Sequence, residues 1–416
     1  MDGRGSRVTL ASMTRPLRLL LAAIAMLASA CAAPARAEAQ ARASWDGVAR
    51  VVVIGDLHGD YEKFADMLAA AALIDAEGDW VGGQAHLVQL GDIPDRGPST
   101  RAIMDHLMRL ERQARRAGGH VHALIGNHEA MNVEGDLRYT VAEEYAAFAD
   151  RNSARRRDAF YERTLDYLRQ NPPEAGLPVF DEAFRGQWYS EHPLGFVEHR
   201  EAWSARGNYG GWVAAHDSVI RINQTLYLHG GLGPAFPSAD ANAMNQAVRA
   251  ALRGAPRPDF ADILTNEQGP LWYRGLASNE EAVELPHVEA LLARHGVAHI
   301  VIGHTKRAPL VLPRFGGRVI LTDIAVPSGH TDPHAFLMEE NGELLAVHRG
   351  QRVALRASSQ PEVCAYLAAI AALDPPNSPV AGLSASCASP SESTTRKRSL
   401  WPSVEKASSA VSSICA

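Results

Sequence analysis

The amino-acid sequence predicts an α/β protein, and three patterns carry this prediction. Short apolar runs rich in β-forming residues recur along the chain, amphipathic segments separate the first three of them, and closely spaced runs follow near the end. The early part therefore has a βαβαβ pattern, and the late part is rich in hairpins. We expect strands at residues 50–55, 85–90, 120–125, 217–222, 225–229, 297–302, 318–323, 334–339 and 343–348.

Helices are expected between the first three strands. Two sets of apolar residues recur there at helical spacing: Tyr61, Phe64, Ala65 and Leu68, and then Ile103, Leu107 and Leu110. The long segment 139–212 differs from the strands around it, with a helical first half and an aromatic, basic second half. Aromatic residues in helices commonly form a core, but this segment enters and leaves at the motifs described next. We therefore expect it to act as a lid, with Trp188, Trp203 or Tyr209 covering the site.

Six short polar motifs follow one another along the chain, four of them directly after apolar runs. They are GDLHG (55–59), GDIPDRG (91–97), GNHE (126–129), HGG (229–231), WYRG (272–275) and VIGHT (301–305). A chain that repeatedly leaves a buried strand and then presents Asp, His or Asn builds a site at the carboxyl ends of a sheet, where open α/β folds bind ligands.

The first motifs offer ligands for a metal ion. Asp56 and His58 are two residues apart at a strand end, so both side chains can point towards one cation. Asp92 ends the next strand, and its two carboxylate oxygens can bridge two divalent ions. The sequence therefore indicates a site for more than one metal.

A second ion needs ligands of its own. Asn127 offers a carbonyl oxygen, and His229 and His304, each directly after an apolar strand, offer imidazole nitrogens. Mixed nitrogen and oxygen ligation with few carboxylates suits Mn, Fe or Zn better than Ca. We expect two divalent ions, with Mn as the first choice and Fe or Zn as alternatives.

Such a pair of ions indicates hydrolysis of a phosphoester. Two ions lower the pKa of a bridging water, so we expect hydroxide to be the nucleophile rather than a side chain. His128, next to Asn127, is placed to protonate the leaving alkoxide, and Asp95 can stabilise its imidazolium form. Arg96 and Arg274 offer planar guanidinium groups that match phosphate oxygens.

Each motif also has a purely structural interpretation. Glycine-rich turns after strands are common, Asp92 could cap a helix that begins near Pro98, and Arg96 could form a surface ion pair. Glu129 and Trp272 are the motif residues most typical of a structural role. The joint occurrence of all six motifs in this order nevertheless favours the functional interpretation.

Together the motifs resemble the phosphoprotein phosphatase family of calcineurin-like metallophosphoesterases. The runs GNHEAMNVEGDLRY (126–139) and GPLWYRG (269–275) resemble its bacterial-type branch, the Shewanella-like phosphatases, and the likeness covers about residues 51–349. The resemblance implies an αββα sandwich of two mixed sheets with a helical, aromatic insertion at 139–212. It also implies metal ligation by Asp56, His58, Asp92, Asn127, His229 and His304, an acid dyad of His128 and Asp95, and phosphate binding by Arg96 and Arg274.

Two positions depart from the family pattern. Pro94 removes a backbone donor from the GDIPDRG loop, which we expect the site to tolerate because the ligating side chains flank it. The stretch LTDIAVPSG (321–329) lacks the SAPNYC loop of the eukaryotic Ser/Thr members. Substrate preference therefore cannot be transferred from those members.

The resulting expectation is a phosphoprotein phosphatase that hydrolyses phosphomonoesters and prefers phosphotyrosine. The alternatives are a hydrolase of small phosphoesters or dinucleoside polyphosphates, and an exported metal-binding module without catalysis. His128 and Asp95 argue against the module, because metal binding alone needs neither of them. The formal net charge of −6 without a basic patch argues against nucleic acid as a partner.

The two ends of the chain differ in composition from the catalytic domain, which we place at 48–350. Arg15 and Arg18 precede a short apolar run (19–30) and the small-residue site Ala-Arg-Ala (35–37), so residues 1–37 are expected to be a signal for export to the periplasm without a membrane span. The stretch LASAC (27–31) offers the alternative of a lipid anchor at Cys31.

Beyond residue 350 we expect a C-terminal helix near 362–373 and, from about Asp374, a Ser/Pro-rich linker and disordered tail reaching residue 416. Cysteine use fits an oxidising compartment. A disulfide between Cys364 and Cys387 would join the helix to the tail and leave Cys415 unpaired, although spacing alone fixes no pairing.

Overall fold

The computed structural model describes residues 43–173, 176–324 and 334–388 of the 416. The expected export signal, the alternative lipidation site at Cys31, most of the stretch LTDIAVPSG and the residue Cys415 lie outside these ranges. The described residues from Trp45 onward belong to one compact unit. Among them, no helix is both long enough and apolar enough to cross a membrane.

Two six-stranded mixed sheets form the centre of this unit. The first has the order β12-β11-β10-β2-β3-β4, in which β2, β3 and β4 are parallel and β10 pairs antiparallel with β2. Its strands are β2 (Arg50–Ile54), β3 (His86–Gln89), β4 (His120–Ala123), β10 (Ala335–Glu340), β11 (Glu343–His348) and β12 (Gln351–Ala354). From Val51 to Ile54 the side chains of β2 are all buried, as in a parallel strand covered on both faces.

The second sheet has the order β1-β5-β6-β7-β9-β8. Here β6, β7 and β9 are parallel neighbours, while β5 and β8 pair antiparallel with β6 and β9. Its strands are β1 (Ser44–Trp45), β5 (Val219–Ile222), β6 (Thr225–Leu228), β7 (His299–Ile302), β8 (Leu312–Arg314) and β9 (Val319–Leu321). The nine expected strands are present, each within two residues of its expected bounds, whereas the short β1, β8 and β12 were not expected.

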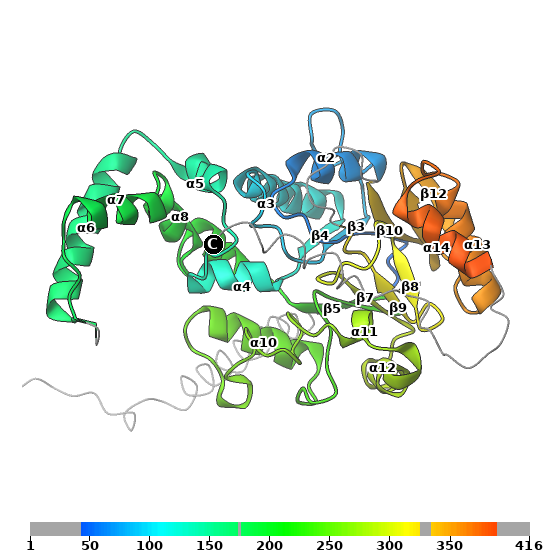
Figure 1. The fold of residues 1–416 in the computed structure, drawn as a ribbon. Helices are drawn as coiled ribbons and strands as arrows, with labels where there is room; N and C mark the ends of the chain where they lie inside the picture. Colours follow the sequence, from blue (N-terminus) through cyan, green and yellow to red (C-terminus); the bar gives the residue numbers. More distant parts are fainter. Residues whose placement is uncertain (1–42, 174–175, 325–333, 389–416) are drawn as a thin grey trace, which may run out of the picture. The chain divides into compact units, whose positions relative to one another are not determined.

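Helices cover the outer faces of the two sheets (Figure 1). On one side lie α2 (Tyr61–Ala70) and α3 (Thr100–Ala117), and on the other α10 (Ala241–Leu252) and α12 (Glu281–His295). The apolar residues that predicted α2 and α3, among them Phe64, Leu68, Ile103 and Leu107, are buried in the main core. The result is the expected αββα sandwich, with η2 (Pro258–Phe260) and α11 (Gly275–Ser278) in its connections.

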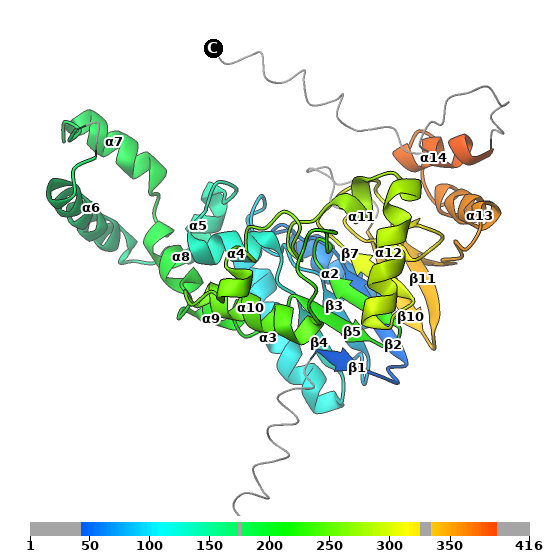
Figure 2. The ribbon, with the colours of Figure 1, turned by 90° about the horizontal axis from the view of Figure 1, so that it is seen from below.

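The described residues of the insertion form helices joined by loops, in its aromatic second half as well as in its first. It comprises α5 (Ala142–Phe148), α6 (Ser153–Gln170), α7 (Glu182–Glu191), α8 (Phe196–Trp203) and α9 (Asn208–Val213). Figures 1 and 2 both show α6 and α7 lying away from the two sheets. They have a small core of their own, built on Tyr161, Leu165 and Trp188.

The C-terminal segment is more ordered than the sequence indicated. The expected helix is present as α13 (Gln360–Ala371), but the expected disordered tail is wrong for residues 379–388, which form α14 (Pro379–Ala388). Val380 at the start of α14 is fully buried in the main core, so packing against the fold outweighs the Ser- and Pro-rich composition. Cys364 is disulfide-bonded, while the side chains of Cys387 and Cys415 lie outside those described.

Candidate active site

The strand order places the polar motifs at one edge of each sheet. Because β2, β3 and β4 are parallel, the residues that follow them meet at the same edge: Asp56 and His58, then Asp92, then Asn127 at the start of α4 (Asn127–Glu134). The parallel strands β6 and β7 of the other sheet bring His229 and His304 to the corresponding edge. All six side chains are buried.

Asp92 lies between two groups of nitrogen and oxygen donors. Its Oδ1 is 3.2 Å from Nε2 of His229, and its Oδ2 is 3.9 Å from Nε2 of His58. Asp92, His229 and His304 form one compact cluster, and His58, Asp92 and His128 form another. The two oxygens of this carboxylate therefore face different groups, as a bridging ligand requires.

The remaining donors complete the two groups. Nε2 of His229 lies 3.0 Å from Oδ1 of Asn127 and 3.1 Å from Nδ1 of His304. On the other side, Oδ2 of Asp56 lies 3.8 Å from Nε2 of His58, while its Oδ1 accepts a hydrogen bond from the backbone N–H of His304 (3.0 Å). That backbone bond turns the second oxygen of Asp56 towards His58.

Each of the three histidines has its other ring nitrogen next to a backbone carbonyl. Nδ1 of His58 is 3.2 Å from the Pro94 oxygen, Nδ1 of His229 is 2.9 Å from the Leu90 oxygen, and Nε2 of His304 is 3.2 Å from the Trp272 oxygen. A carbonyl can only accept, so in the neutral imidazole the proton lies on the nitrogen next to the carbonyl and the lone pair on the nitrogen that faces the cluster. Metal-ligating histidines are held in this way.

Buried negative charge is the second sign that the cluster fits cations. Burial, together with the charges of Asp323 and Asp92, raises the pKa of Asp56 well above its usual value. Asp323 is itself buried and directly follows Thr322, at the end of β9 in the second sheet. Cations between these carboxylates would relieve the repulsion, so the residues present fit a pair of divalent ions.

The loops that carry these residues have an unusual backbone. Five of the candidate site residues have positive φ angles in the left-handed region: His58, Asp92, Asp95, Arg96 and His304. Non-glycine residues in this region cost roughly 1–3 kcal/mol each and gather at functional sites, where the surrounding structure enforces them. None of the six motifs indicated this backbone geometry.

Glu129 provides part of that enforcement. Its carboxylate accepts hydrogen bonds from three backbone N–H groups, those of Asp92 (2.9 Å), Ile93 (2.7 Å) and Gly126 (2.7 Å). It therefore ties the GDIPDRG loop to the start of α4 and has the structural role that its residue type suggested. Gly126 is required there, because a Cβ at this position would clash with Oδ1 of Asp92.

His128 and Asp95 form a buried pair beside the donor groups. Nδ1–H of His128 donates to Oδ2 of Asp95 (2.5 Å), which also accepts from Nδ2 of Asn132 (3.1 Å), while Oδ1 of Asp95 accepts from the Thr140 hydroxyl (2.9 Å). Burial opposes the charged imidazolium, but the charges of Asp92 and Asp95 and the hydrogen bond to Asp95 outweigh it and raise the pKa of His128. These contacts therefore favour the protonated form of His128, which is the form that a general acid needs.

The two candidate phosphate-binding arginines both reach the cluster. Nη1 of Arg96 is 2.7 Å from Nε2 of His58, and its Nη2 is 3.3 Å from Nε2 of His128. Nη1 of Arg274 donates to the backbone oxygen of His304 (2.8 Å) and to the hydroxyl of Thr305 (3.1 Å). The structure thus brings together all ten residues that the sequence indicated.

The aromatic residues expected to cover this site do not do so. Trp188, Trp203 and Tyr209 are all buried, Trp188 in the small core of α6 and α7 and the other two in the main core. This expectation was wrong because these aromatic side chains are buried by packing between helices. Tyr139, at the end of the GNHEAMNVEGDLRY run, is instead the exposed aromatic residue next to His128 and Arg96.

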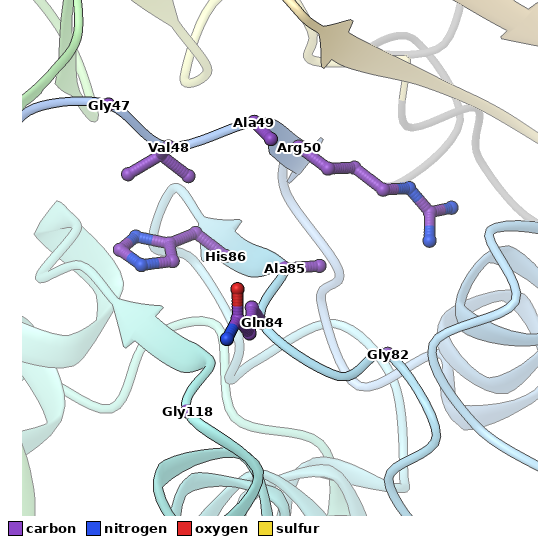
Figure 3. A pocket seen from close by; sticks show the side chains of 9 residues that line it. All are labelled: Gly47, Val48, Ala49, Arg50, Gly82, Gln84, Ala85, His86 and Gly118. Carbon is purple, nitrogen blue, oxygen red and sulfur yellow. The ribbon is translucent and has the colours of Figure 1, made fainter.

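A separate pocket of about 290 Å³ lies at the opposite ends of the strands (Figure 3). Its lining includes Arg50 and His86, which begin β2 and β3, together with Val48 and Gln84. His86 also has its Nδ1 3.0 Å from Nε2 of His122. None of the ten candidate site residues lines this pocket, so it is distinct from the candidate active site.

This chain is similar in sequence and fold to known proteins. The family model described as calcineurin-like phosphoesterase matches residues 49–308, a range that holds all ten candidate residues. The Shewanella-like protein phosphatase 2 of Arabidopsis thaliana is 28% identical over 299 residues, which are 68% of this chain and 73% of that protein. The Shewanella-like protein phosphatase 1 of Plasmodium berghei is 23% identical over 269 residues, 63% of this chain and 62% of that protein.

Solved structures agree with this family match. The cold-active protein-tyrosine phosphatase of a psychrophilic Shewanella species is 28% identical, with a TM-score of 0.57 and coverage of 76% of this chain and 82% of that one. The αββα fold, the paired donor groups and the family match lead to the same conclusion. This chain belongs to the calcineurin-like phosphoesterase family and is a metal-dependent phosphoester hydrolase.

Proposed function

We propose that this protein is a phosphoprotein phosphatase with two metal ions that hydrolyses phosphomonoesters and prefers phosphotyrosine. The observation that carries the proposal is the position of Asp92, whose two oxygens face separate donor groups while the His128–Asp95 pair lies next to it. Metal binding alone would not need that pair. The pair therefore favours an enzyme over a metal-binding module.

The donor groups divide naturally between two ions. Asp56, His58 and Asp92 would hold the first, and Asp92 would hold the second together with Asn127, His229 and His304. When bound, two such ions acidify water and neutralise phosphoryl oxygens. The mixture of imidazole, amide and carboxylate ligands supports Mn, with Fe or Zn as alternatives.

The remaining residues handle the substrate. Arg96 and Arg274 bind the phosphoryl oxygens through their guanidinium groups, which lie on either side of the cluster next to His58 and His304. The bond between phosphorus and the leaving oxygen breaks, a water oxygen forms the new bond to phosphorus, and that water releases a proton to solvent. His128 transfers its proton to the leaving oxygen, and Asp95 holds the imidazole in place before and after the transfer.

The preference for phosphotyrosine is supported by similarity to a protein described as a protein-tyrosine phosphatase, at 28% identity. Export is supported by the N-terminal sequence and by the disulfide at Cys364, since disulfides persist in oxidising compartments such as the periplasm. We therefore propose a periplasmic location, with a lipid anchor at Cys31 as the alternative to a cleaved signal.

Activity of the mature, metal-reconstituted protein tests this proposal. The substrates are matched phosphotyrosine and phosphoserine peptides, a phosphodiester and diadenosine tetraphosphate, each with Mn, Fe or Zn. We expect the highest kcat/KM with the phosphotyrosine peptide. Faster cleavage of diadenosine tetraphosphate would favour the dinucleoside polyphosphate alternative, and absence of turnover with every metal would refute the enzyme.

A further inference from the structure

Tyr139 is an exposed aromatic side chain at the leaving-group side of the candidate site. Its ring centroid lies 5.1 Å from that of His128, at an interplanar angle of 42°. The Cζ atom of Arg96 lies 5.6 Å from the centroid of the same ring. Tyr139 is 43% exposed, so one part of its ring contacts the proton donor and a phosphate-binding arginine while the rest is open to solvent.

The backbone around Tyr139 is fixed although its side chain is exposed. The N–H of Arg96 donates to the Tyr139 carbonyl (2.9 Å), and the N–H of Thr140 donates to the carbonyl of Leu137 (3.0 Å), closing a turn. The hydroxyl of Thr140 donates to Oδ1 of Asp95 (2.9 Å). The backbone that carries the ring is therefore anchored to Arg96 through the Tyr139 carbonyl and to the acid pair through Thr140.

This position coincides with the path of the leaving group. To receive the proton, the ester oxygen must come within about 3 Å of Nε2 of His128. In an aryl ester the aromatic ring begins at the next atom, so it lies beside the imidazole and within reach of the Tyr139 ring. Aromatic pairs are favourable at centroid separations of about 4.5–7 Å. An alkyl ester places only a methylene group there.

We propose that Tyr139 determines substrate specificity by stacking against the aryl leaving group of phosphotyrosine. The inference rests on the proposed phosphatase function and adds the side chain that recognises the substrate class. Tyr139 takes the role that was expected of Trp188, Trp203 or Tyr209, whose rings are buried. Tyr139 does not take part in proton transfer, so its removal changes the choice between substrates rather than the chemistry.

The test compares three variants of the metal-loaded protein. Tyr139→Leu removes the ring, Tyr139→Phe keeps it without the hydroxyl, and Tyr167→Leu removes an exposed tyrosine from α6 as a matched surface control. Each is assayed with paired phosphotyrosine and phosphoserine peptides and for inhibition by inorganic phosphate. We expect Tyr139→Leu to lower kcat/KM for the phosphotyrosine peptide about 3- to 10-fold, the value of one aromatic pair.

The phosphoserine value and the phosphate inhibition constant should change less than the phosphotyrosine value in Tyr139→Leu, because the ring beside Arg96 is lost for every substrate, whereas the contact with an aryl leaving group is lost for phosphotyrosine alone. Tyr139→Phe and Tyr167→Leu should keep the wild-type ratio of the two substrates. Equal losses on both peptides, or a Phe variant that behaves like Leu, would overturn the proposal. The ratio of kcat/KM for the two peptides in the wild-type protein tests the proposed preference for phosphotyrosine. The effect of Tyr139→Leu on that ratio tests the role of Tyr139, so the two proposals can fail separately.

Discussion

Replacing Asp95 by Asn tests the proposed acid pair with little change in shape. Asp95 is fully buried and its carboxylate accepts three hydrogen bonds, from His128, Asn132 and Thr140. The amide keeps the volume but loses the negative charge that faces the imidazole. Its NH₂ group can also turn towards Nδ1–H of His128, which would break the contact.

The size of the effect follows from the contact with His128. A hydrogen bond to a charged group contributes about 1.5–3 kcal/mol, which is a factor of roughly 10 to 150 in rate. We therefore expect Asp95→Asn to lower kcat by about this factor for an ester with a poor leaving group. The pKa of His128 is raised in part by Asp95, so the variant should lower it and move the alkaline limb of the kcat profile to lower pH.

The assay compares two aryl phosphates. With p-nitrophenyl phosphate the leaving group departs without much help from an acid, so the loss should be small. With phenyl phosphate or a phosphotyrosine peptide the full loss should appear. Thr140→Val, which removes a neutral donor from the same carboxylate, is the control and should cost less than about tenfold. Equal losses on both esters, at unchanged metal content, would refute the assignment of His128 and Asp95.

Three further outcomes follow from the structure. Asp92→Asn should lose bound metal together with turnover, because both donor groups share this carboxylate, and full metal occupancy on elemental analysis would exclude a bridging role. Arg96→Ala and Arg274→Ala should each lower kcat/KM about tenfold or more and weaken inhibition by phosphate, with Lys restoring only part; unchanged inhibition in both would show that they do not bind phosphate. Burial lowers the pKa of His86 from 6.5 to about 4, because the folded protein favours the neutral imidazole. The stability that neutral His86 allows is therefore fully present above pH 6.5 and is lost as the pH falls towards 4. The free energy of unfolding, measured in urea, should fall between pH 7 and pH 5 in both proteins, but by about 1–2 kcal/mol less in His86→Gln than in wild type. An equal fall in both proteins would contradict this.

Much of the fold could be predicted because its signals are local. A buried strand such as Arg50–Ile54 is a run of apolar β-formers wherever it lies, and a helix such as α3 shows its buried face through the spacing of Ile103, Leu107 and Leu110. The short β8 (LPR) and β12 (QRVA) were missed because neither contains a run of apolar β-forming residues. The order of α14 was missed because it depends on packing of Val380 into the core.

The chemistry of the candidate site was also determined by the sequence. Asp56, Asp92 and His304 directly follow strands, and parallel strands bring such residues to one edge of a sheet whatever the loops do. Residue type then restricted what that edge can bind. The grouping of the six candidate metal ligands is therefore a consequence of strand order, which the motifs already indicated.

Only the tertiary structure decided how those residues face one another. Which oxygen of Asp92 faces which histidine, and which nitrogen of His229 is held by the Leu90 carbonyl, depend on left-handed loops and on backbone contacts between distant segments. The same holds for the insertion, where Trp203 packs in the core while Tyr139 lies exposed beside His128. Both are aromatic residues of one segment, and packing alone decides which of them is buried. The sequence shows the chemistry of each side chain but not which residues it will contact.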